Sequence, residues 1–263
     1  MNGKVYQTGF RHSVAERLRF IDTHLFWHGR INRADVIGSF GVSPAQAAAD
    51  LKEYLAQSGR GVHYDTRAKA YIANGGFRPV FGLPNAVKGL EELGTSGDPL
   101  IEKLLPLERP VDPALAARLR RAARDAEKVR IHYQSFTKPQ PSWRWVAPSR
   151  LVSDGQRWHM RAWCFRESSW KDFVLARVLE LGEAADAGEL PEDSEWIERV
   201  ELVLAPSDQL SKGQRASVVR EFGMQGGALR VTLPRAMRLY ALRRWGLDKP
   251  DSRLVVAEER TVD

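Results

Sequence analysis

Residues 32–57 read NRADVIGSFGVSPAQAAADLKEYLAQ, and this stretch contains two helix starts separated by a tight turn. Asn32 can cap a short helix that ends before Gly41, because its side chain can accept from the free backbone N–H groups of a first turn. Ser43 can cap a second helix, with a proline in its first turn, that extends to about Gln57. The pattern therefore predicts two helices joined by a short break.

A further helix and a hairpin flank this pair. Upstream, apolar residues recur at helical spacing over residues 12–27. Downstream, residues 62–64 and 69–72 alternate like strands around a turn at Asp65. Three short helices followed by a hairpin are typical of a winged helix-turn-helix domain, which we assign to residues 1–76. Such a domain places its third helix in the major groove of double-stranded DNA, while a basic hairpin reaches the phosphate backbone.

The third helix is expected to bury Leu51 and Leu55, which recur along one face. We expect the following positions to face outward: Pro44, Gln46, Ala47, Asp50 and Tyr54. Gln46 can bond an adenine edge or can only close a capping box with Ser43, and the sequence leaves both open. Asp50 is expected to orient a nearby arginine or lysine. The candidate DNA contacts are Arg33, Ser43, Gln46, Ala47 (against a thymine methyl), Lys52, Arg67 and Lys69.

Residues 77–125 are predicted to form a helical linker. Glycines and prolines are frequent over residues 74–99, which is typical of a connector. Helical spacing returns over residues 86–93 and again over residues 112–128, where several arginines decorate the pattern.

Short alternating runs begin at Val129 and predict a small sheet or barrel within residues 126–190. The expected strands are Val129–Tyr133, Arg144–Val146, Arg157–Trp163 and Asp172–Arg177, with a break at Pro148 among others. Residues 129–177 hold five of the eight tryptophans, interleaved with arginines. Bases stack on such rings and guanidinium groups bind phosphates, so the pattern favours a nucleic-acid or nucleotide ligand. The tryptophans can instead form the barrel core, whereas alternation places His159 and Arg161 together on the candidate ligand face.

The C-terminal part differs from the barrel in charge. Residues 118–177 carry 14 Lys and Arg against 5 Asp and Glu, whereas residues 178–263 carry 12 against 16. Strand and helix patterns alternate twice after the acidic stretch, which predicts a small α/β domain over residues 196–263. The basic block of the barrel therefore indicates an anion-binding region separate from the winged helix.

The composition is that of an ordinary globular protein, with 263 residues, a net charge of +7 and 28% charged residues. We find no apolar run long enough to span a membrane and expect no membrane partner. The single cysteine, Cys164, cannot form an internal disulfide, and the N-terminus lacks the apolar core of a signal peptide, so we expect a cytoplasmic location. No catalytic motif, metal-ligand set or cofactor motif stands out, and we expect a binding protein rather than an enzyme.

Four segments resemble a WYL domain: residues 129–135 (VRIHYQS), 145–148 (WVAP), 155–163 (GQRWHMRAW) and 171–178 (KDFVLARV). Trp158-His159-Met160 stands in place of the Trp-Tyr-Leu triplet that names this domain. With a winged helix before it and an extension after it, the chain resembles WYL-domain transcription factors. It is most similar to the BrxR/CapW-like repressors of bacterial BREX and CBASS phage-defence islands.

This resemblance implies an α+β multidomain fold, with a winged helix-turn-helix, an Sm-like β-barrel (the WYL domain) and a small α/β C-terminal dimerisation domain. It implies a homodimeric repressor that binds an inverted-repeat operator upstream of its own operon. It also implies that the barrel senses a nucleic-acid or nucleotide ligand. Carried onto matching positions, the ligand contacts are Tyr133, Ser135, Arg150, His159, Arg161 and Arg177.

Two alternatives from other classes remain. His132 and His159 in an arginine-rich pocket could perform acid–base chemistry on a phosphodiester, which would make the chain a nucleotide-cleaving enzyme. A nucleic-acid-binding protein without sequence preference would carry the same basic regions. Products released from short oligonucleotides would indicate the enzyme, and binding that ignores sequence would indicate the non-specific protein.

Overall fold

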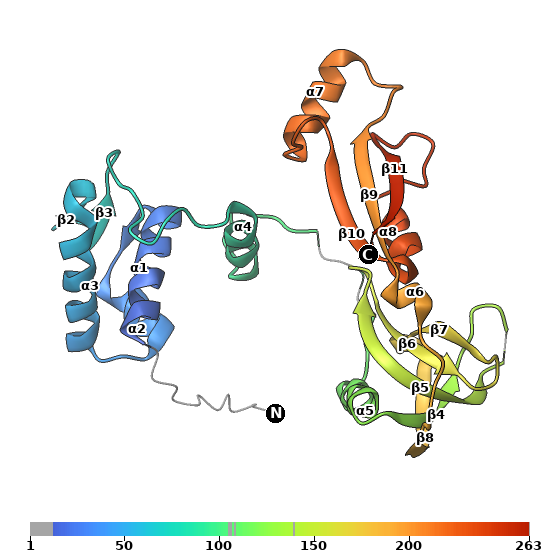
Figure 1. The fold of residues 1–263 in the computed structure, drawn as a ribbon. Helices are drawn as coiled ribbons and strands as arrows, with labels where there is room; N and C mark the ends of the chain where they lie inside the picture. Colours follow the sequence, from blue (N-terminus) through green and yellow to red (C-terminus); the bar gives the residue numbers. More distant parts are fainter. Residues whose placement is uncertain (1–12, 105–106, 108, 139, 263) are drawn as a thin grey trace. The chain divides into compact units, whose positions relative to one another are not determined.

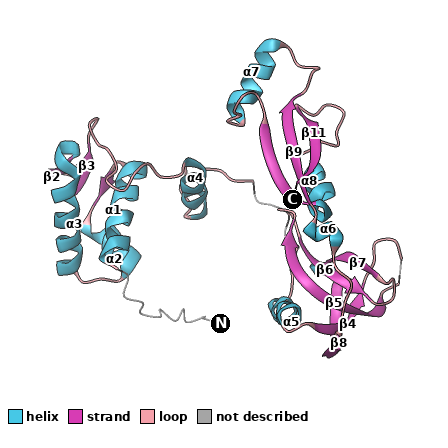
Figure 2. Ribbon diagram, viewed as in Figure 1, coloured by secondary structure: helices cyan, strands magenta, loops and turns pink. Residues whose placement is uncertain are grey.

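The computed structural model describes residues 13–104, 107, 109–138 and 140–262. The chain divides into two compact units, residues 1–105 and residues 106–263, and each is described by itself. The first unit is mainly helical and the second is built mainly of strands (Figure 2). No helix in the described part of the chain is long and apolar enough to cross a membrane. The expectation about a signal peptide concerns the N-terminus, whose residues 1–12 lie outside the described ranges.

The first unit has the predicted winged helix-turn-helix order (Figure 1). Its elements are α1 (Val14–His28), β1 (Arg30–Ile31), α2 (Arg33–Phe40), α3 (Pro44–Ser58), the 3-10 turn η1 (Gly59–Gly61), β2 (Val62–Asp65), β3 (Ala70–Ala73) and α4 (Ala86–Thr95). The strands form an antiparallel sheet in the order β1-β3-β2. The expected helices and hairpin are therefore confirmed.

Local caps explain where these helices begin and end. The Ser13 side chain accepts from the Glu16 N–H, and the Glu16 carboxylate accepts from the Ser13 N–H. The two bonds together form a capping box. Asn32 accepts from the backbone of Ala34 and Asp35 at the start of α2. Apolar residues then fill a common core under the helices: Leu18, Ile21, Leu25, Ile31, Val36 and Leu51.

The second unit begins with a helix and five antiparallel strands, which match the expected Sm-like WYL domain. These elements are α5 (Pro113–Arg124), β4 (Glu127–Tyr133), β5 (Ser142–Ser153), β6 (Trp158–Cys164), β7 (Ser169–Val174), the 3-10 turn η2 (Leu175–Arg177) and β8 (Val178–Asp186). The strand order is β7-β6-β5-β4-β8. Leu115 and Leu119 of α5 pack into the same core as Val129 of β4 and Met160 of β6.

Pro148 lies inside β5 rather than at a break between strands, so the expected break there is wrong. The register between β5 and β6 shifts between Pro148 and Arg150, which marks an irregularity of the bulge type. A bulge tolerates the missing proline N–H and bends the strand. One long bent strand therefore replaces the short one expected at Arg144–Val146.

The C-terminal part is a three-stranded antiparallel sheet with helices. Its elements are α6 (Ser194–Ile197), β9 (Arg199–Pro206), α7 (Lys212–Glu221), β10 (Leu229–Pro234), the 3-10 turn η3 (Arg235–Met237), α8 (Arg238–Arg244) and β11 (Leu254–Val262). The strand order is β10-β9-β11, with β9 at the centre. The alternating strand and helix pattern is confirmed, and β11 is an additional strand that the sequence did not reveal.

Candidate nucleic-acid interface

The turn between α2 and α3 is fixed by two caps. Gly41 ends α2 with a φ of +63°, in the left-handed region that favours glycine, and its N–H donates to the Ile37 carbonyl oxygen. Ser43 starts α3, where its Oγ accepts from the Gln46 N–H at 3.1 Å. These caps orient α3 relative to α2 within the winged-helix unit.

The buried face of α3 differs from the expected one. Ala47 is 0% exposed, and Asp50 and Tyr54 are each 1% exposed, so the outward placement of these three residues is wrong. Ala47 faces the core, and a base contact by its methyl group is excluded in this fold. Gln46 and Lys52 lie on the exposed side of α3.

The polar groups on the buried face of α3 have partners inside the unit. Arg17 of α1 donates to both Asp50 oxygens, from Nε at 2.6 Å and from Nη2 at 3.1 Å. The Asp50 carboxylate thereby raises the pKa of Arg17. The Tyr54 hydroxyl donates to Asp22 of α1 at 2.5 Å, and Asp22 also accepts from the Val80 N–H. The expectation that Asp50 orients an arginine is confirmed, but that arginine is buried.

Gln46 adopts neither of the two expected arrangements in full. Its backbone N–H is capped by Ser43, but its side chain does not close the box. Instead, Gln46 Nε2 donates to Asp50 Oδ1 at 2.9 Å, four residues along the helix. The buried Arg17–Asp50 pair therefore positions the Gln46 amide at the exposed start of α3, and a contact with a base stays a prediction.

Four cations of the first unit are exposed and lie on elements expected to approach DNA: Arg33, Lys52, Arg67 and Lys69. Asp65 shapes the β2–β3 turn by accepting from the N–H groups of Arg67 and Ala68 at 2.8 and 2.9 Å. Within the described ranges, none of the four exposed cations forms an ion pair with a carboxylate. Their charges are therefore free to contact phosphates.

The structure divides the six expected ligand residues into two groups. The first lies at the end of β4, where Tyr133 is buried and its hydroxyl accepts from the Val174 N–H at 3.2 Å. Ser135 follows in the loop, with its Oγ 3.1 Å from Thr137 Oγ1. Arg177 stacks over Phe136, with its Cζ 5.3 Å from the ring centroid. Ser135 and Arg177 are half-buried, whereas Tyr133 holds the strand end together.

The second group lies where β5 and β6 pair and where the C-terminal part covers β6. Arg150 is exposed and stacks over Trp196, with its Cζ 5.2 Å from the ring centroid. Arg161 is 3% exposed and donates to Asp193 at 2.7 and 2.8 Å and to Glu195 at 2.9 Å. Burial lowers the pKa of Arg161, but these carboxylates more than reverse the effect and raise it. The expected open ligand face is therefore closed at Arg161 by acidic partners.

His159 is also buried by partners from its own unit. Its Nε2 lies 3.0 Å from Asp154 Oδ2, and its ring packs on Tyr240 with centroids 4.6 Å apart. Burial raises the pKa of Asp154, but hydrogen bonds from His159 and from the N–H groups of Gln156 and Arg157 lower it to about 2. The alternation that groups His159 with Arg161, opposite the core residue Met160, is confirmed.

The tryptophans of the WYL domain do not form its core, so that alternative is wrong. Trp143 is 37% exposed and Trp158 is 52% exposed. The other three are absent from the buried core cluster: Trp145, Trp163 and Trp170. Trp143 instead stacks on His132 at 4.9 Å and lies under Arg130, whose Cζ is 5.2 Å from its ring centroid. Trp145 likewise lies under a cation, Lys128, whereas Trp163 and Trp170 pack against each other with ring centroids 5.8 Å apart.

Three family models match successive parts of the chain. The BrxR transcriptional regulator winged helix-turn-helix domain matches residues 13–94, the WYL domain matches residues 114–182, and the BrxR C-terminal dimerization domain matches residues 199–262. Curated relatives from several bacteria carry the name DNA-binding transcriptional repressor CapW. That of Pseudomonas aeruginosa is 35% identical over 93% of this chain and 87% of its own length.

Those of Stenotrophomonas maltophilia and Escherichia coli are similarly related. They are 34% and 30% identical over 94% and 93% of this chain, and over 87% and 86% of their own lengths. The chain belongs to the CapW/BrxR family of transcriptional regulators. A solved structure of the proteasome accessory factor B/C of Arthrobacter aurescens matches at 17% identity with a TM-score of 0.26, covering all of this chain and 49% of that one.

In this CapW/BrxR-family chain, the residues that enclose Arg161 and His159 were not identified from the sequence. Asp193 and Glu195 close the Arg161 site, and Tyr240 of α8 covers His159 while donating to Asp172 at 3.1 Å. The available signal was the acidic stretch that follows the basic block, because opposite charges adjacent in a chain can pair. Tyr240 gave no such signal.

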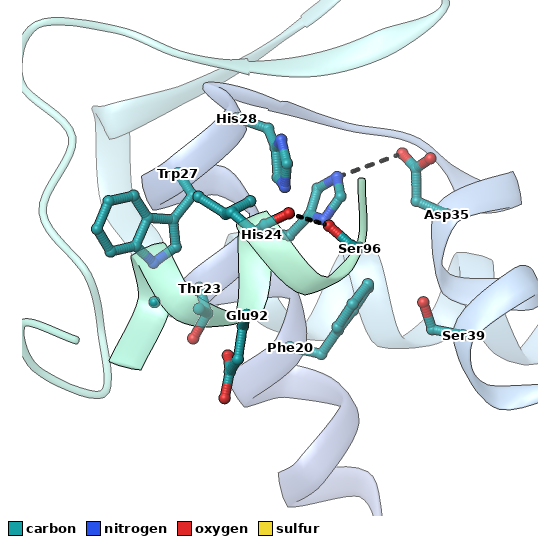
Figure 3. Close-up of a pocket in the computed structure, with 11 residues that line it drawn as sticks. Phe20, Thr23, His24, Trp27, His28, Asp35, Ser39, Glu92 and Ser96 are labelled. Atoms are coloured by element: carbon teal, nitrogen blue, oxygen red, sulfur yellow. Dashed lines mark hydrogen bonds and ion pairs between the residues drawn. The ribbon is translucent and has the colours of Figure 1, made fainter. Parts of the chain in front are cut away.

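The winged helix of this CapW/BrxR-family chain also contains a cavity of about 430 Å³ between α1, α2 and α4 (Figure 3). His24 and His28 stack with centroids 4.2 Å apart, and His24 Nε2 lies 3.9 Å from Asp35 Oδ2. Burial lowers the pKa of His24, and His28 lowers it further. In the part of the chain that the structure describes, no group of three His, Cys, Asp or Glu residues is arranged to hold a metal ion.

Proposed function

We propose that this chain is a homodimeric repressor that recognises an inverted-repeat operator and autoregulates an anti-phage defence operon. The observation that carries the proposal is the exposed surface of α3 and the β2–β3 hairpin, which presents Gln46 beside cations without carboxylate partners. The name DNA-binding transcriptional repressor, borne by the relatives, supports the same function.

DNA reading follows from the placement of these groups. A helix of 15 residues such as α3 fits the major groove, with its first turn nearest the base edges. Gln46 in that turn would bond an adenine, with Ser43 beside it. Lys52, Arg33 and the hairpin cations Arg67 and Lys69 would contact phosphates and fix the register of the helix.

Dimerisation would supply the two-fold symmetry of the operator. The match to the BrxR C-terminal dimerization domain at residues 199–262 supports this assignment. Two winged helices held by one dimer would occupy two half-sites about one helical turn of DNA apart, or a multiple of it. The spacing between half-sites would then depend on the geometry of the dimer.

The WYL domain would sense a nucleic-acid or nucleotide ligand that changes this geometry. Ser135, Arg150 and Arg177 are the accessible candidates for anion contacts. Arg161 would contribute only after Asp193 and Glu195 release it. The dimer would have one geometry that fits the operator and another that does not. A ligand lowers operator occupancy from 99% to 1% only if its binding free energies for these two geometries differ by roughly 5.5 kcal/mol.

The nucleotide-cleaving alternative is weakened by the positions of its two histidines. His132 pairs across the sheet with Trp143 near the start of β5, whereas His159 pairs with Val152 near its end. To act as acid and base, both histidines would have to reach one phosphodiester. Most of the length of β5 (Ser142–Ser153) separates the positions opposite them, so they are not placed to do so. We therefore favour a regulator over an enzyme.

A nuclease-protection footprint on the DNA upstream of the gene tests the proposal. The expected result is a protected region whose two halves are related by an inverted repeat. If protection instead extends evenly along the DNA and increases with protein concentration, the non-specific alternative is favoured and the proposed operator is overturned.

A further inference from the structure

Two adjoining pockets lie where the β5–β6 turn of the WYL domain meets α8. The larger is about 250 Å³ in volume, and the smaller is about 100 Å³. They share three lining residues, Asp154, Tyr240 and Arg244, and therefore form one continuous site. This site is separate from the ligand residues assigned at the end of β4, and it adjoins the assigned residue His159, which contacts Asp154 and Tyr240.

The larger pocket is apolar and ends in an aromatic ring. Its apolar lining comes from β10, from the segment η3–α8 and from the residue directly after α8: Val231, Leu233, Met237, Ala241 and Trp245. Trp245 is 40% exposed, so its ring is available to a ligand. Pockets for drug-sized molecules begin at roughly 300 Å³, so this one fits a single ring system. A flat aromatic ring gains stacking against the indole at this position.

The smaller pocket is cationic. Arg243 and Arg244, from the last turn of α8, line it together with Arg157 and Gln156. Both α8 arginines are exposed, and within the described ranges their side chains form neither an ion pair nor a hydrogen bond. Arg157 is held by Asp154, with its Nε 3.3 Å from Oδ2. Two uncommitted guanidinium groups thus adjoin the apolar pocket.

The turn opposite α8 is shaped to let one of these guanidinium groups approach. A Cβ at Gly155 would lie 2.9 Å from Arg244 Nε, and Gly155 has a φ of +79°. This backbone conformation favours glycine here, whereas the Arg244 side chain, which is exposed, could shift away from a Cβ. Asp154 also lines the smaller pocket, but Arg157 pairs with it and offsets its charge, so the charges of Arg243 and Arg244 remain uncompensated.

We infer that this site binds a mononucleotide, with the base in the apolar pocket and the phosphate against Arg243 and Arg244. The guanidinium fork matches phosphate oxygens, and the adjacent ring pocket accepts the base. Tyr240 connects the site to the buried ion pairs, since it contacts His159 and donates to Asp172. An occupant would thus bridge the WYL domain and the C-terminal domain, and only this regulatory role rests on the proposed function.

Isothermal titration of the full chain, without DNA, tests the binding. The probes are AMP, CMP, adenosine and inorganic phosphate. We expect at least one of the two mononucleotides to bind one per chain, and adenosine and phosphate to bind at least tenfold more weakly. The double variant Arg243→Ala/Arg244→Ala should weaken nucleotide binding at least tenfold. Trp245→Ala should weaken it by a similar factor through lost stacking.

Arg220→Ala is the matched control, because Arg220 is an exposed arginine on α7 away from the site. It should leave nucleotide binding unchanged. No heat of binding for either mononucleotide at millimolar concentration, equal binding of adenosine, or equal loss in the Arg220 control would each overturn the inference. Binding of upstream DNA by the double variant is measured separately, so a failure of the repressor function is distinguishable from a failure of this site.

Discussion

Asp50 and Tyr54 face the core of the winged helix because each has a polar partner there. Those partners, Arg17 and Asp22, lie 33 and 32 residues away in sequence, so no local pattern reveals them. Helical periodicity places polar residues outward and therefore misassigned this face of α3. The capping residues Ser43 and Asn32 were predictable, because a cap acts only on its own first turn.

Asp50→Ala should lower the free energy of unfolding by about 3–5 kcal/mol, because it leaves the buried Arg17 without its counter-charge. Glu53→Ala is the control on the same helix, since Glu53 is exposed, and should change stability by less than about 0.5 kcal/mol. Urea denaturation measures both. Equal small losses would show that the Arg17–Asp50 pair does not stabilise α3.

Gln46→Ala and Arg67→Ala should weaken DNA binding in different ways. Loss of the Gln46 amide should cost about 1–3 kcal/mol on the operator, relax one base position and leave random DNA unaffected. Loss of Arg67 should weaken both DNAs alike and reduce the slope of log affinity against log salt by about 1. Salt titrations of both variants, with melting curves as a folding check, decide this. The reverse pattern would contradict these roles.

Asp154 should make the free energy of unfolding depend on pH in the acidic range. Burial raises its pKa, but hydrogen bonds from His159 and from the Gln156 and Arg157 N–H groups lower it to about 2, below the ordinary value of 3.8. The folded state therefore binds this proton less readily than the unfolded state. The resulting stability, at most about 2 kcal/mol, is present above about pH 4 and is lost as the pH falls toward about 2.

Denaturation of the wild type and of Asp154→Asn over this pH range measures that contribution. The advantage of the wild type should shrink as the pH falls. A difference between the two proteins that stays constant with pH would contradict the role of this carboxylate.

At the scale of elements, helices with clear caps were predictable, whereas two edge strands in acidic segments, β8 and β11, were not. β8 and β11 each lie at the edge of their sheet, and their exposed faces carry residues such as Glu180 and Glu258. Edge strands in proteins often carry charges that block further pairing. Those charges obscured the alternation on which strand prediction depends, and both segments read as acidic tail.

The contact between α4 and α1 rests on a glycine. A Cβ at Gly89 would lie 2.3 Å from the ring of Trp27, so Gly89→Ala should displace the ring and cost about 1–3 kcal/mol. Gly38→Ala in α2 meets nothing within 4 Å and should stabilise the chain by up to about 1 kcal/mol through helix propensity. Thermal unfolding of both variants gives the two signs. Stabilisation by both would show that α4 does not pack on Trp27.

At the scale of the whole molecule, the excess of Lys and Arg in the WYL domain overestimates how many of its cations lack a carboxylate partner. The positive charge of the winged helix is a better guide to its unpaired cations. Arg161 is matched by Asp193 and Glu195, and Arg130 is matched by Glu183. By contrast, Arg33, Arg67 and Lys69 have no carboxylate partner within the described residues. The order of domains could be predicted from sequence, but pairing across the fold could not, because it depends on contacts between distant segments.

The most direct test of the regulator assignment is fluorescence-polarisation binding to the DNA upstream of the gene. The assay uses a large excess of random competitor at near-physiological salt. We expect saturable binding that survives the competitor, with two chains per site. Binding that the competitor abolishes would contradict a sequence-specific repressor and reduce the winged helix to a general DNA anchor.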